Sequence, residues 1–153
     1  MATTTAAVTL TSDLMSANIS VSATTTCMKA GTTADGLDML DYGVIDIVTG
    51  DQFDILGADD DDGTPIAGVM ANKANKVYIA NHSTDETYYV TIMIDAQNVG
   101  RLYAGDWLWM PWDCDLTAAA NDSSIECQAY TGENIIEHAL FHNGETLLTA
   151  ADS

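Results

Sequence analysis

The amino-acid sequence predicts an all-β fold, a single-domain β-sandwich or jelly roll with an extended N-terminal arm. The chain has 153 residues, of which 19 are threonine and 47% are apolar. Its clearest segments alternate between two kinds of side chain with a period of two, which is the pattern of half-buried strands. About ten such segments recur at intervals of roughly 8–14 residues, as in sandwiches and jelly rolls. This length and apolar content suffice for one core, so we expect one packed domain.

The predicted organisation is an arm followed by a sandwich. Residues 1–26 are rich in Ala, Thr and Ser and carry one charge, Asp13, so they form an arm or first strands suited to contact with another protein. Residues 27–153 form the sandwich domain. The predicted strands of the whole chain, in order, are 6–10, 18–28, 44–48, 52–56, 66–70, 77–81, 87–94, 99–103, 106–112, 125–130, 134–141 and 145–149.

Turn residues predict how some of these strands connect. Thr49-Gly50-Asp51 joins the third and fourth predicted strands, and a glycine-containing connection of this length predicts a hairpin. The polar segment His82–Glu86 joins the sixth and seventh predicted strands and predicts a second hairpin. Asn143-Gly144, between the last two, is typical of a tight turn.

Alternation along two of the strands assigns residues to the core. We expect one face of 87–94 to meet the core, and it carries Tyr88, Val90, Ile92 and Ile94. We expect one face of 125–130 to be buried and the other to be wet. The buried set is Ile125, Cys127 and Ala129, and the wet set is Glu126, Gln128 and Tyr130.

The three tryptophans lie within six positions of each other, in the predicted strand 106–112. On a strand Trp107 and Trp109 share one face, whereas Trp112 falls on the other with Leu108 and Met110. Such a strand is either covered on both sides at the centre of a sandwich or presents one side to a partner. Core packing, a protein interface and a carbohydrate-stacking platform therefore all stay open for these residues.

The charge of the chain excludes two classes of partner. Against 23 Asp and Glu there are only 4 Lys and Arg, for a net charge of −19. Nucleic-acid phosphates and anionic membranes both attract a cationic surface, which this chain cannot supply. No apolar run reaches membrane-spanning length and no basic residue precedes Lys29, so we expect neither a transmembrane helix nor a secretory signal.

Three cysteines and one acidic run complete the candidate sites. Cys27, Cys114 and Cys127 are sparse and form no CxxC motif, so we expect buried small apolar residues in a reducing cytosol, with a Cys114–Cys127 bridge as the alternative. The acidic run fails the register of an EF-hand. It remains either a solvated loop or a loose divalent-cation site, formed by Asp59, Asp60, Asp61 and Asp62.

Motifs for catalysis are absent from the sequence. His138 and His142 have the spacing that aligns two ligands on a helix, with Glu137 beside them, but on a strand they lie about 13 Å apart and cannot share a metal ion. There is no GxSxG, P-loop or GxGxxG motif. We therefore expect no enzyme, no catalytic residue, no metal and no cofactor, although an acidic glycosidase stays open as a distant alternative.

Four segments carry a resemblance to a known class of proteins. They are Val77-Tyr-Ile-Ala-Asn-His-Ser-Thr, Tyr89-Val-Thr-Ile, Gly100-Arg-Leu-Tyr-Ala-Gly-Asp-Trp-Leu-Trp-Met-Pro-Trp112 and Glu137-His-Ala-Leu-Phe141. The run resembles small structural proteins of tailed bacteriophage virions, whose pattern reads roughly as xYIxN, a strand, xGxLxAGDxxxxPW and a closing xxLF. The similarity spans about residues 77–141, and residues 1–76 have no such counterpart.

The resemblance implies a function and a place. Such proteins look like capsid decoration (cement) proteins, which are β-rich, often trimeric, and bind the major capsid protein on the outside of the head. It therefore implies a homo-oligomer, with a trimer favoured, made in the host cytoplasm and located on the capsid exterior of the virion. A tail or neck structural protein and a carbohydrate-binding adhesion module are the alternatives. The expected contact residues are Val8, Leu10, Ile19, Val21, Trp107, Trp109 and Trp112.

Overall fold

The computed structural model describes residues 4–12, 19–27, 37, 39–56, 75–94, 96–112 and 125–142. Within these ranges the chain forms β-strands and no helix. The strands are β1 (Thr4–Ser12), β2 (Ile19–Cys27), β3 (Met39–Val48), β4 (Gln52–Leu56), β5 (Lys76–Asn81), β6 (Tyr89–Ile94), β7 (Gln97–Tyr103), β8 (Trp107–Pro111), β9 (Ile125–Ala129) and β10 (Glu133–His142). The predicted all-β fold is confirmed.

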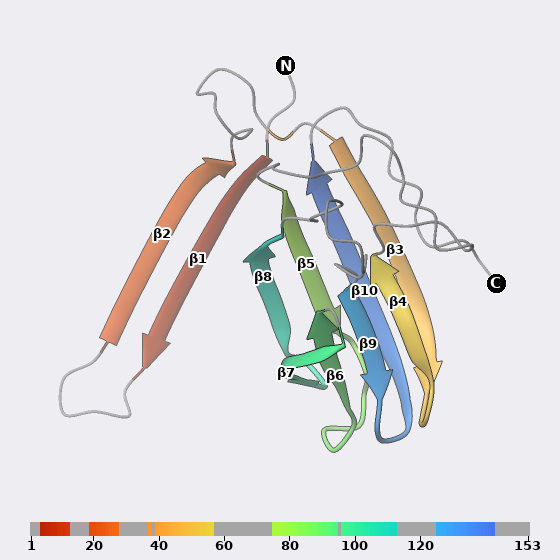
Figure 1. Ribbon diagram of the computed structural model, residues 1–153. Coiled ribbons are helices and arrows are strands. Elements are labelled where there is room, and N and C mark those ends of the chain that lie inside the picture. The colour runs from red at the N-terminus through yellow and green to blue at the C-terminus, as the bar shows by residue number, and fades with distance from the viewer. Residues whose placement is uncertain are drawn as a thin grey trace.

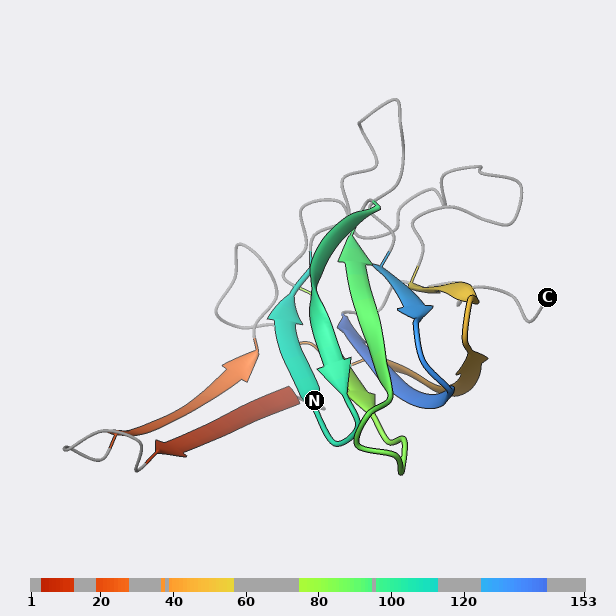
Figure 2. The ribbon, with the colours of Figure 1, turned by 90° about the horizontal axis from the view of Figure 1, so that it is seen from below.

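The strands form one hairpin and two larger sheets. One four-stranded sheet has the order β3-β10-β5-β8 and the other has the order β4-β9-β6-β7, while β1 and β2 pair only with each other. All pairs are antiparallel. Figure 1 shows the two four-stranded sheets stacked on each other with the β1–β2 hairpin to one side, and Figure 2 shows the hairpin projecting away from the stack.

The pairing of the strands is nested. β3 pairs with β10, β4 with β9, β5 with β8, and β6 with β7. This is the pattern of one long antiparallel ribbon that wraps around the core, so that its successive strand pairs fall alternately in the two sheets. The described strands therefore have the topology of a jelly roll, as the sequence predicted among its two options.

Both hairpins predicted in the body of the chain are wrong. β3 and β4 lie in different sheets, and so do β5 and β6. The polar segments Thr49–Asp51 and His82–Glu86 carry the chain over the ends of the sandwich instead of turning it back within one sheet. The body strands that are consecutive and paired are β6 and β7, joined through Ala96, whose φ is 55°. The predicted strands 66–70 and 145–149 and the turn at Asn143-Gly144 lie outside the described residues.

The core fills the space between the two sheets with alternate residues. Val90, Ile92, Ile125, Cys127 and Ala129 are all buried, as their positions on β6 and β9 predicted. Tyr88 and Ile94, from the same predicted core face, are half-buried, and Thr91 and Met93 on the opposite side of β6 are buried as well. The opposite face of β9 is less wet than predicted. Glu126 is buried and accepts a hydrogen bond from Gln52 Nε2 on the neighbouring strand β4. The paired amide makes burial of this carboxylate tolerable.

A buried hydrogen-bond network connects three segments of the chain at one end of the sandwich. Asn81 Nδ2 donates to Leu102 O and to Asn134 Oδ1, each at 3.1 Å. The Ser83 backbone N–H donates to Asn81 Oδ1 at 3.0 Å, and Asn134 Nδ2 donates to Thr131 O at 2.8 Å. These bonds join the end of β5 to β7 and to the start of β10, so this end of the sandwich is held by buried amides that have hydrogen-bond partners.

A close approach of two residues explains one glycine in β3. Gly43 lies opposite His138 of β10, and a Cβ atom at Gly43 would stand 2.6 Å from His138 Cε1. Cβ atoms do not tolerate so short a contact, so the imidazole ring occupies the place of a side chain on β3. Gly100 of β7 provides a contrast, because a Cβ atom there would meet no heavy atom within 4 Å.

Gly43→Ala is expected to lower the free energy of unfolding by about 1–3 kcal/mol, because the added methyl group overlaps the His138 ring. Gly100→Ala is the matched control and should leave stability unchanged or slightly raised. Denaturant unfolding followed by tryptophan fluorescence measures both. Adding His138→Ala to Gly43→Ala should restore part of the free energy of unfolding that Gly43→Ala removes. Equal effects of the two glycine substitutions would contradict this account of Gly43.

Candidate binding surfaces

The first candidate surface is the β1–β2 hairpin, which contains no charged residue in either nine-residue strand. Near its tip Leu10 is opposite Val21, and these side chains are 58% and 53% exposed. At its base Thr4 N and Thr4 Oγ1 donate to Leu37 O at 3.0 and 2.8 Å, and Leu37 N donates to Cys27 O. The hairpin is thus anchored at one end and free of the body at the other (Figure 2).

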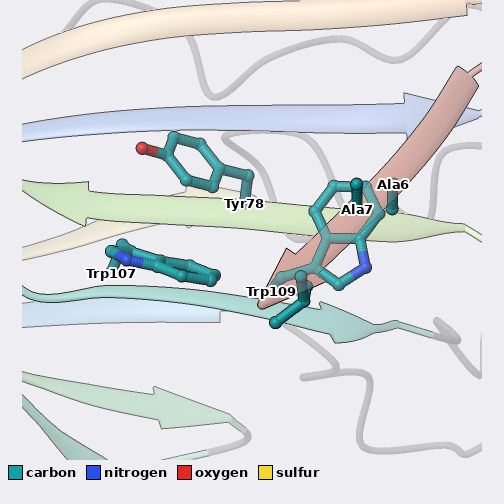
Figure 3. A pocket seen from close by; sticks show the side chains of 6 residues that line it. Ala6, Ala7, Tyr78, Trp107 and Trp109 are labelled. Atoms are coloured by element: carbon teal, nitrogen blue, oxygen red, sulfur yellow. The ribbon is translucent and has the colours of Figure 1, made fainter. Parts of the chain in front are cut away.

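The hairpin and the β3-β10-β5-β8 sheet enclose a pocket of ≈ 290 Å³. Ala6, Ala7 and Val8 of β1 line one side, and three aromatic rings on β5 and β8 line the other, from Tyr78, Trp107 and Trp109. Figure 3 shows β1 passing in front of this sheet, with Ala6 and Ala7 beside Trp109. The contact between hairpin and sheet is therefore incomplete, and it leaves apolar side chains lining an open space.

The tryptophans divide between two environments, as alternation along β8 predicted. Trp107 is 50% exposed, Trp109 is half-buried, and Trp112, just after β8, is 4% exposed within the core. The expected contact role of Trp112 is therefore wrong, because its side chain packs inside this chain. β8 is an edge strand, and its outer side faces β1 across the pocket. Trp107 and Trp109 are the two tryptophans that this side presents.

Aromatic neighbours order these two rings. The Trp107 ring lies 6.5 Å from that of Tyr78 on β5, and the Trp109 ring lies 5.2 Å from that of Phe141 on β10 in an edge-to-face arrangement. Both separations are in the range of favourable aromatic pairs. Together the rings form an aromatic surface across three adjacent strands.

The second candidate surface is the outer side of the whole β3-β10-β5-β8 sheet, which we call the apolar face. Of the eleven large apolar residues that are exposed in the described part of the chain, six lie on this face: Leu40, Tyr42, Val44, Val48, Ile135 and Trp107. The outer side of the other sheet differs. It carries Gln52, Asp54, Gln128, Thr91 and Arg101, with a tyrosine cluster at one end.

One carboxylate lies in the middle of the apolar face. Glu137 Oε1 accepts a hydrogen bond from the Tyr42 hydroxyl at 2.9 Å, and Glu137 Oε2 lies 2.7 Å from His82 Nε2. Hydrogen bonding to His82 and then to Tyr42 lowers the pKa of Glu137. The hydrogen bond to Glu137 raises the pKa of Tyr42, and burial followed by the charge of Glu137 raises that of Tyr78.

The hydrogen bonds from His82 and Tyr42 favour the ionised form of Glu137. A carboxyl group with a lowered pKa stays ionised at neutral pH and does not donate a proton, so Glu137 is unsuited to act as a general acid. In the sequence Glu137 was considered only beside His138 and His142, and its partners Tyr42 and His82 were not predicted. The signal was available, since alternation places Glu137 between Ile135 and Ala139 on an otherwise apolar face.

The histidines of β10 and the described cysteines are structural residues of the strands and the core. His138 and His142 both lie on strand β10, the arrangement in which the sequence predicted that they cannot share a metal ion, and the His138 side chain is buried. Cys27 and Cys127 are buried free thiols, so Cys127 does not form the alternative bridge, and Cys114 lies outside the described residues. Burial raises the pKa of the Cys127 thiol.

The acidic run of the sequence is not among the residues that the structure describes. Asp59, Asp60, Asp61 and Asp62 lie outside them, as does the side chain of Ile19. In the described ranges, no three His, Cys, Asp or Glu side chains are grouped closely enough to hold a metal ion. No helix in those ranges is long and apolar enough to cross a membrane.

Comparison with known proteins gives no match, whether the chain is compared with family models, with curated sequences or with solved structures.

The stability of the protein is expected to fall as the pH drops from 7 to about 5.5, because of His138. Burial lowers the pKa of this residue, and its Nδ1 atom has no hydrogen-bond partner. Below a pH of about 6.5 the unfolded chain binds a proton at this position that the folded chain does not, so unfolding is favoured. His138→Gln should flatten the slope of unfolding free energy against pH in this window. An unchanged slope would show that His138 is not its source.

Proposed function

We propose that this protein is a capsid decoration (cement) protein of a tailed bacteriophage. It binds the major capsid protein on the outer surface of the head and stabilises the shell by bridging capsomers. Its function is then attachment and reinforcement, and it performs no chemical reaction. The similarity of residues 77–141 to phage structural proteins suggests the class, and the hairpin supports the mode of action.

The uncharged β1–β2 hairpin is the observation that carries the proposal. A two-stranded hairpin is at best marginally stable alone in water, because it has one layer and no core. In this hairpin, residues 20–26 of β2 are exposed along the strand. A surface on another protein would supply the missing second layer, and a strand pair without charges can be buried there without the cost of desolvating ions.

The charge of the chain supports the same proposal. A protein on the outside of a filled head must not compete for the packaged genome, and a net charge of −19 prevents binding to DNA. It must also stay soluble at high copy number, which a large net charge favours. The hairpin is the neutral part of this acidic molecule, so contact is directed to it while the rest of the surface repels.

Replacing Leu10 and Val21 with Asp is expected to abolish attachment to capsid shells, because two charges would have to be buried at the tip of the hairpin. Purified protein is mixed with shells that lack it, and bound protein is measured by sedimentation and located by electron microscopy. The wild-type chain should occupy regular positions on the shell. The double variant should bind at least about tenfold more weakly, a loss of ~1.4 kcal/mol, which removes about 90% of the bound protein when the protein concentration is well below the dissociation constant.

Val99→Asp is the matched control, since Val99 is an equally exposed valine on β7 of the body and should bind like the wild type. Deleting residues 1–26 should leave a folded sandwich that does not attach. Binding only at the portal or tail would contradict decoration and favour the tail or neck alternative. Full binding of the double variant would remove the hairpin as the contact element.

A second candidate function is carbohydrate binding, and the aromatic pocket favours it. Exposed Trp and Tyr rings stack on the apolar faces of sugars, and here Trp107 and Tyr78 lie beside the ionised Glu137, which can accept hydrogen bonds from hydroxyl groups. An adhesion module of this kind would attach a particle to a host surface glycan.

Under this candidate, glycan-array binding by the wild-type protein should disappear in Trp107→Ala. Trp107 is the better test residue than Trp109, because Trp109 also packs on Phe141 and its removal can destabilise the sheet. Tyr103→Ala serves as the control, since Tyr103 is a similarly exposed aromatic residue on the other sheet. Absence of glycan binding by the wild-type chain would contradict the candidate.

A further inference from the structure

The pocket between the hairpin and the β3-β10-β5-β8 sheet has one aromatic wall and one wall of small apolar side chains. Its lining is Tyr78, Trp107 and Trp109 on the sheet and Ala6, Ala7 and Val8 on β1 (Figure 3). None of these six side chains is charged. A dry cavity of ~150 Å³ is large enough to bind benzene. The ≈ 290 Å³ of this pocket therefore has room for a small organic group.

Two of the rings lie close enough to act on one ligand group. The centroids of the Tyr78 and Trp107 rings are 6.5 Å apart, and the ring planes are inclined by 35°. The attraction between a cation and an aromatic ring reaches to ~6 Å from the ring centroid. A cation that rests over the middle of this pair is therefore within range of both rings. Trp107 is 50% exposed, so a ligand can reach its ring.

A carboxylate lies beside the same rings. Ala80 of β5 pairs with Glu137 on one side and with Trp107 on the other. Two strand spacings of ~4.8 Å place the Cα atoms of Glu137 and Trp107 about 10 Å apart on one side of the sheet, with the small Ala80 side chain between them. Hydrogen bonding to His82 is the largest cause that lowers the pKa of Glu137, and a hydrogen bond to Tyr78 adds to it. The carboxylate is therefore ionised at neutral pH and is bonded to a residue of the aromatic wall.

The other charges on this side of the sheet leave its negative potential in place. Asp46 and Glu133 lie on the same outer side, beyond Glu137. Lys76, two residues before Tyr78 on β5, donates from its Nζ atom to the backbone oxygen of its neighbour Asn75 at 3.3 Å. The net charge of −19 gives the whole chain a field that attracts cations and repels anions. The pocket is therefore better suited to a positively charged ligand than to a neutral or negative one.

The side chains around the pocket select among cations. A primary ammonium group is compact, strongly hydrated and carries three N–H donors, and metal cations such as Ca²⁺ and Mg²⁺ require several oxygen ligands. The β1 wall offers only apolar side chains, and both oxygens of Glu137 already have partners within the chain. Toward a ligand Glu137 therefore acts mainly through its charge. A quaternary ammonium group has no N–H donor to satisfy, and aromatic rings are its usual binding surface in proteins.

From these observations we propose that the pocket binds the quaternary ammonium group of a small molecule. The methyl groups rest on the rings of Tyr78 and Trp107, and Glu137 balances the positive charge. The inference does not depend on the capsid, because it concerns the free protein and the side of the hairpin that faces the sheet, whereas attachment is assigned to the hairpin tip. The same rings carry the carbohydrate candidate, but a neutral sugar would make no use of the charge beside them.

Titration of the full-length protein with choline tests the inference. The control ligand is the neutral analogue of choline in which carbon replaces the nitrogen, because the two have the same shape and differ in charge. Binding is followed by the indole N–H signals in proton–nitrogen correlation NMR spectra. Choline should shift the signals of Trp107 and Trp109 and leave that of Trp112 in place, since Trp112 is buried in the core. Choline should bind at least about tenfold more tightly than the neutral analogue and than the primary amine ethanolamine.

Two variants separate the contributions of ring and charge. Trp107→Ala should weaken choline binding at least about tenfold, whereas Tyr103→Ala, on the other sheet, should not weaken it. Glu137→Gln keeps the size of the side chain and removes its charge, so it should weaken choline binding at least about fivefold and leave binding of the neutral analogue unchanged. Glu133→Gln is the matched control, because it removes the same charge from an exposed position farther along β10.

Equal affinities of the wild-type protein for choline and its neutral analogue would overturn the inference. Equal effects of Glu137→Gln and Glu133→Gln would also overturn it, and so would binding of neutral glycans without binding of choline, which would favour the carbohydrate candidate. The titration uses no capsid shells, so its result is independent of whether the protein attaches to them.

Discussion

The architecture depends on the apolar layer between the two four-stranded sheets. Each strand contributes every second residue to that layer, from Val77 and Ile79 on β5 to Ile136 and Leu140 on β10. Strand alternation then determines what the remaining residues can do, because they are left on one of two outer sides. The outer side of the β4-β9-β6-β7 sheet is mostly polar, and that of the β3-β10-β5-β8 sheet is mostly apolar. The proposed contacts follow from this asymmetry and from the uncharged hairpin.

The strands were predictable because their signal is local. Alternation and β-branched residues identify β6, β8, β9 and β10 to within a residue or two, and they assign the buried sides of β6 and β9 correctly. The pairing of strands was not predictable in the same way. A polar connection such as His82–Glu86 suits a hairpin within one sheet and a crossing between two sheets equally well. What selects the crossing is the pairing of β5 with β10 and β8, which lie far away in the chain.

The candidate surfaces, too, were predictable where the sequence signal is local and not where residues meet from distant parts of the chain. Alternation separated Trp107 and Trp109 from Trp112, but it did not tell which side would face inward, and the contact assigned to Trp112 was wrong for that reason. The cluster of Glu137, Tyr42 and His82 joins residues 55 and 95 positions apart in the chain. No local pattern links them, although Glu137 was visible in the sequence as a carboxylate between Ile135 and Ala139 on the outer side of β10. The low charge of residues 1–26 was a local property and was recognised as such.

Acidity and contact are spatially separated in this molecule. The net charge of −19 makes neighbouring copies repel each other, while the uncharged hairpin provides a place where close approach costs little. Electron cryomicroscopy of shells reconstituted with the wild-type protein tests this separation most directly, at a resolution that traces individual strands. The account predicts that the β1–β2 hairpin lies against the shell and that the acidic surfaces face solvent. A hairpin that points into solvent on a fully decorated shell would contradict it.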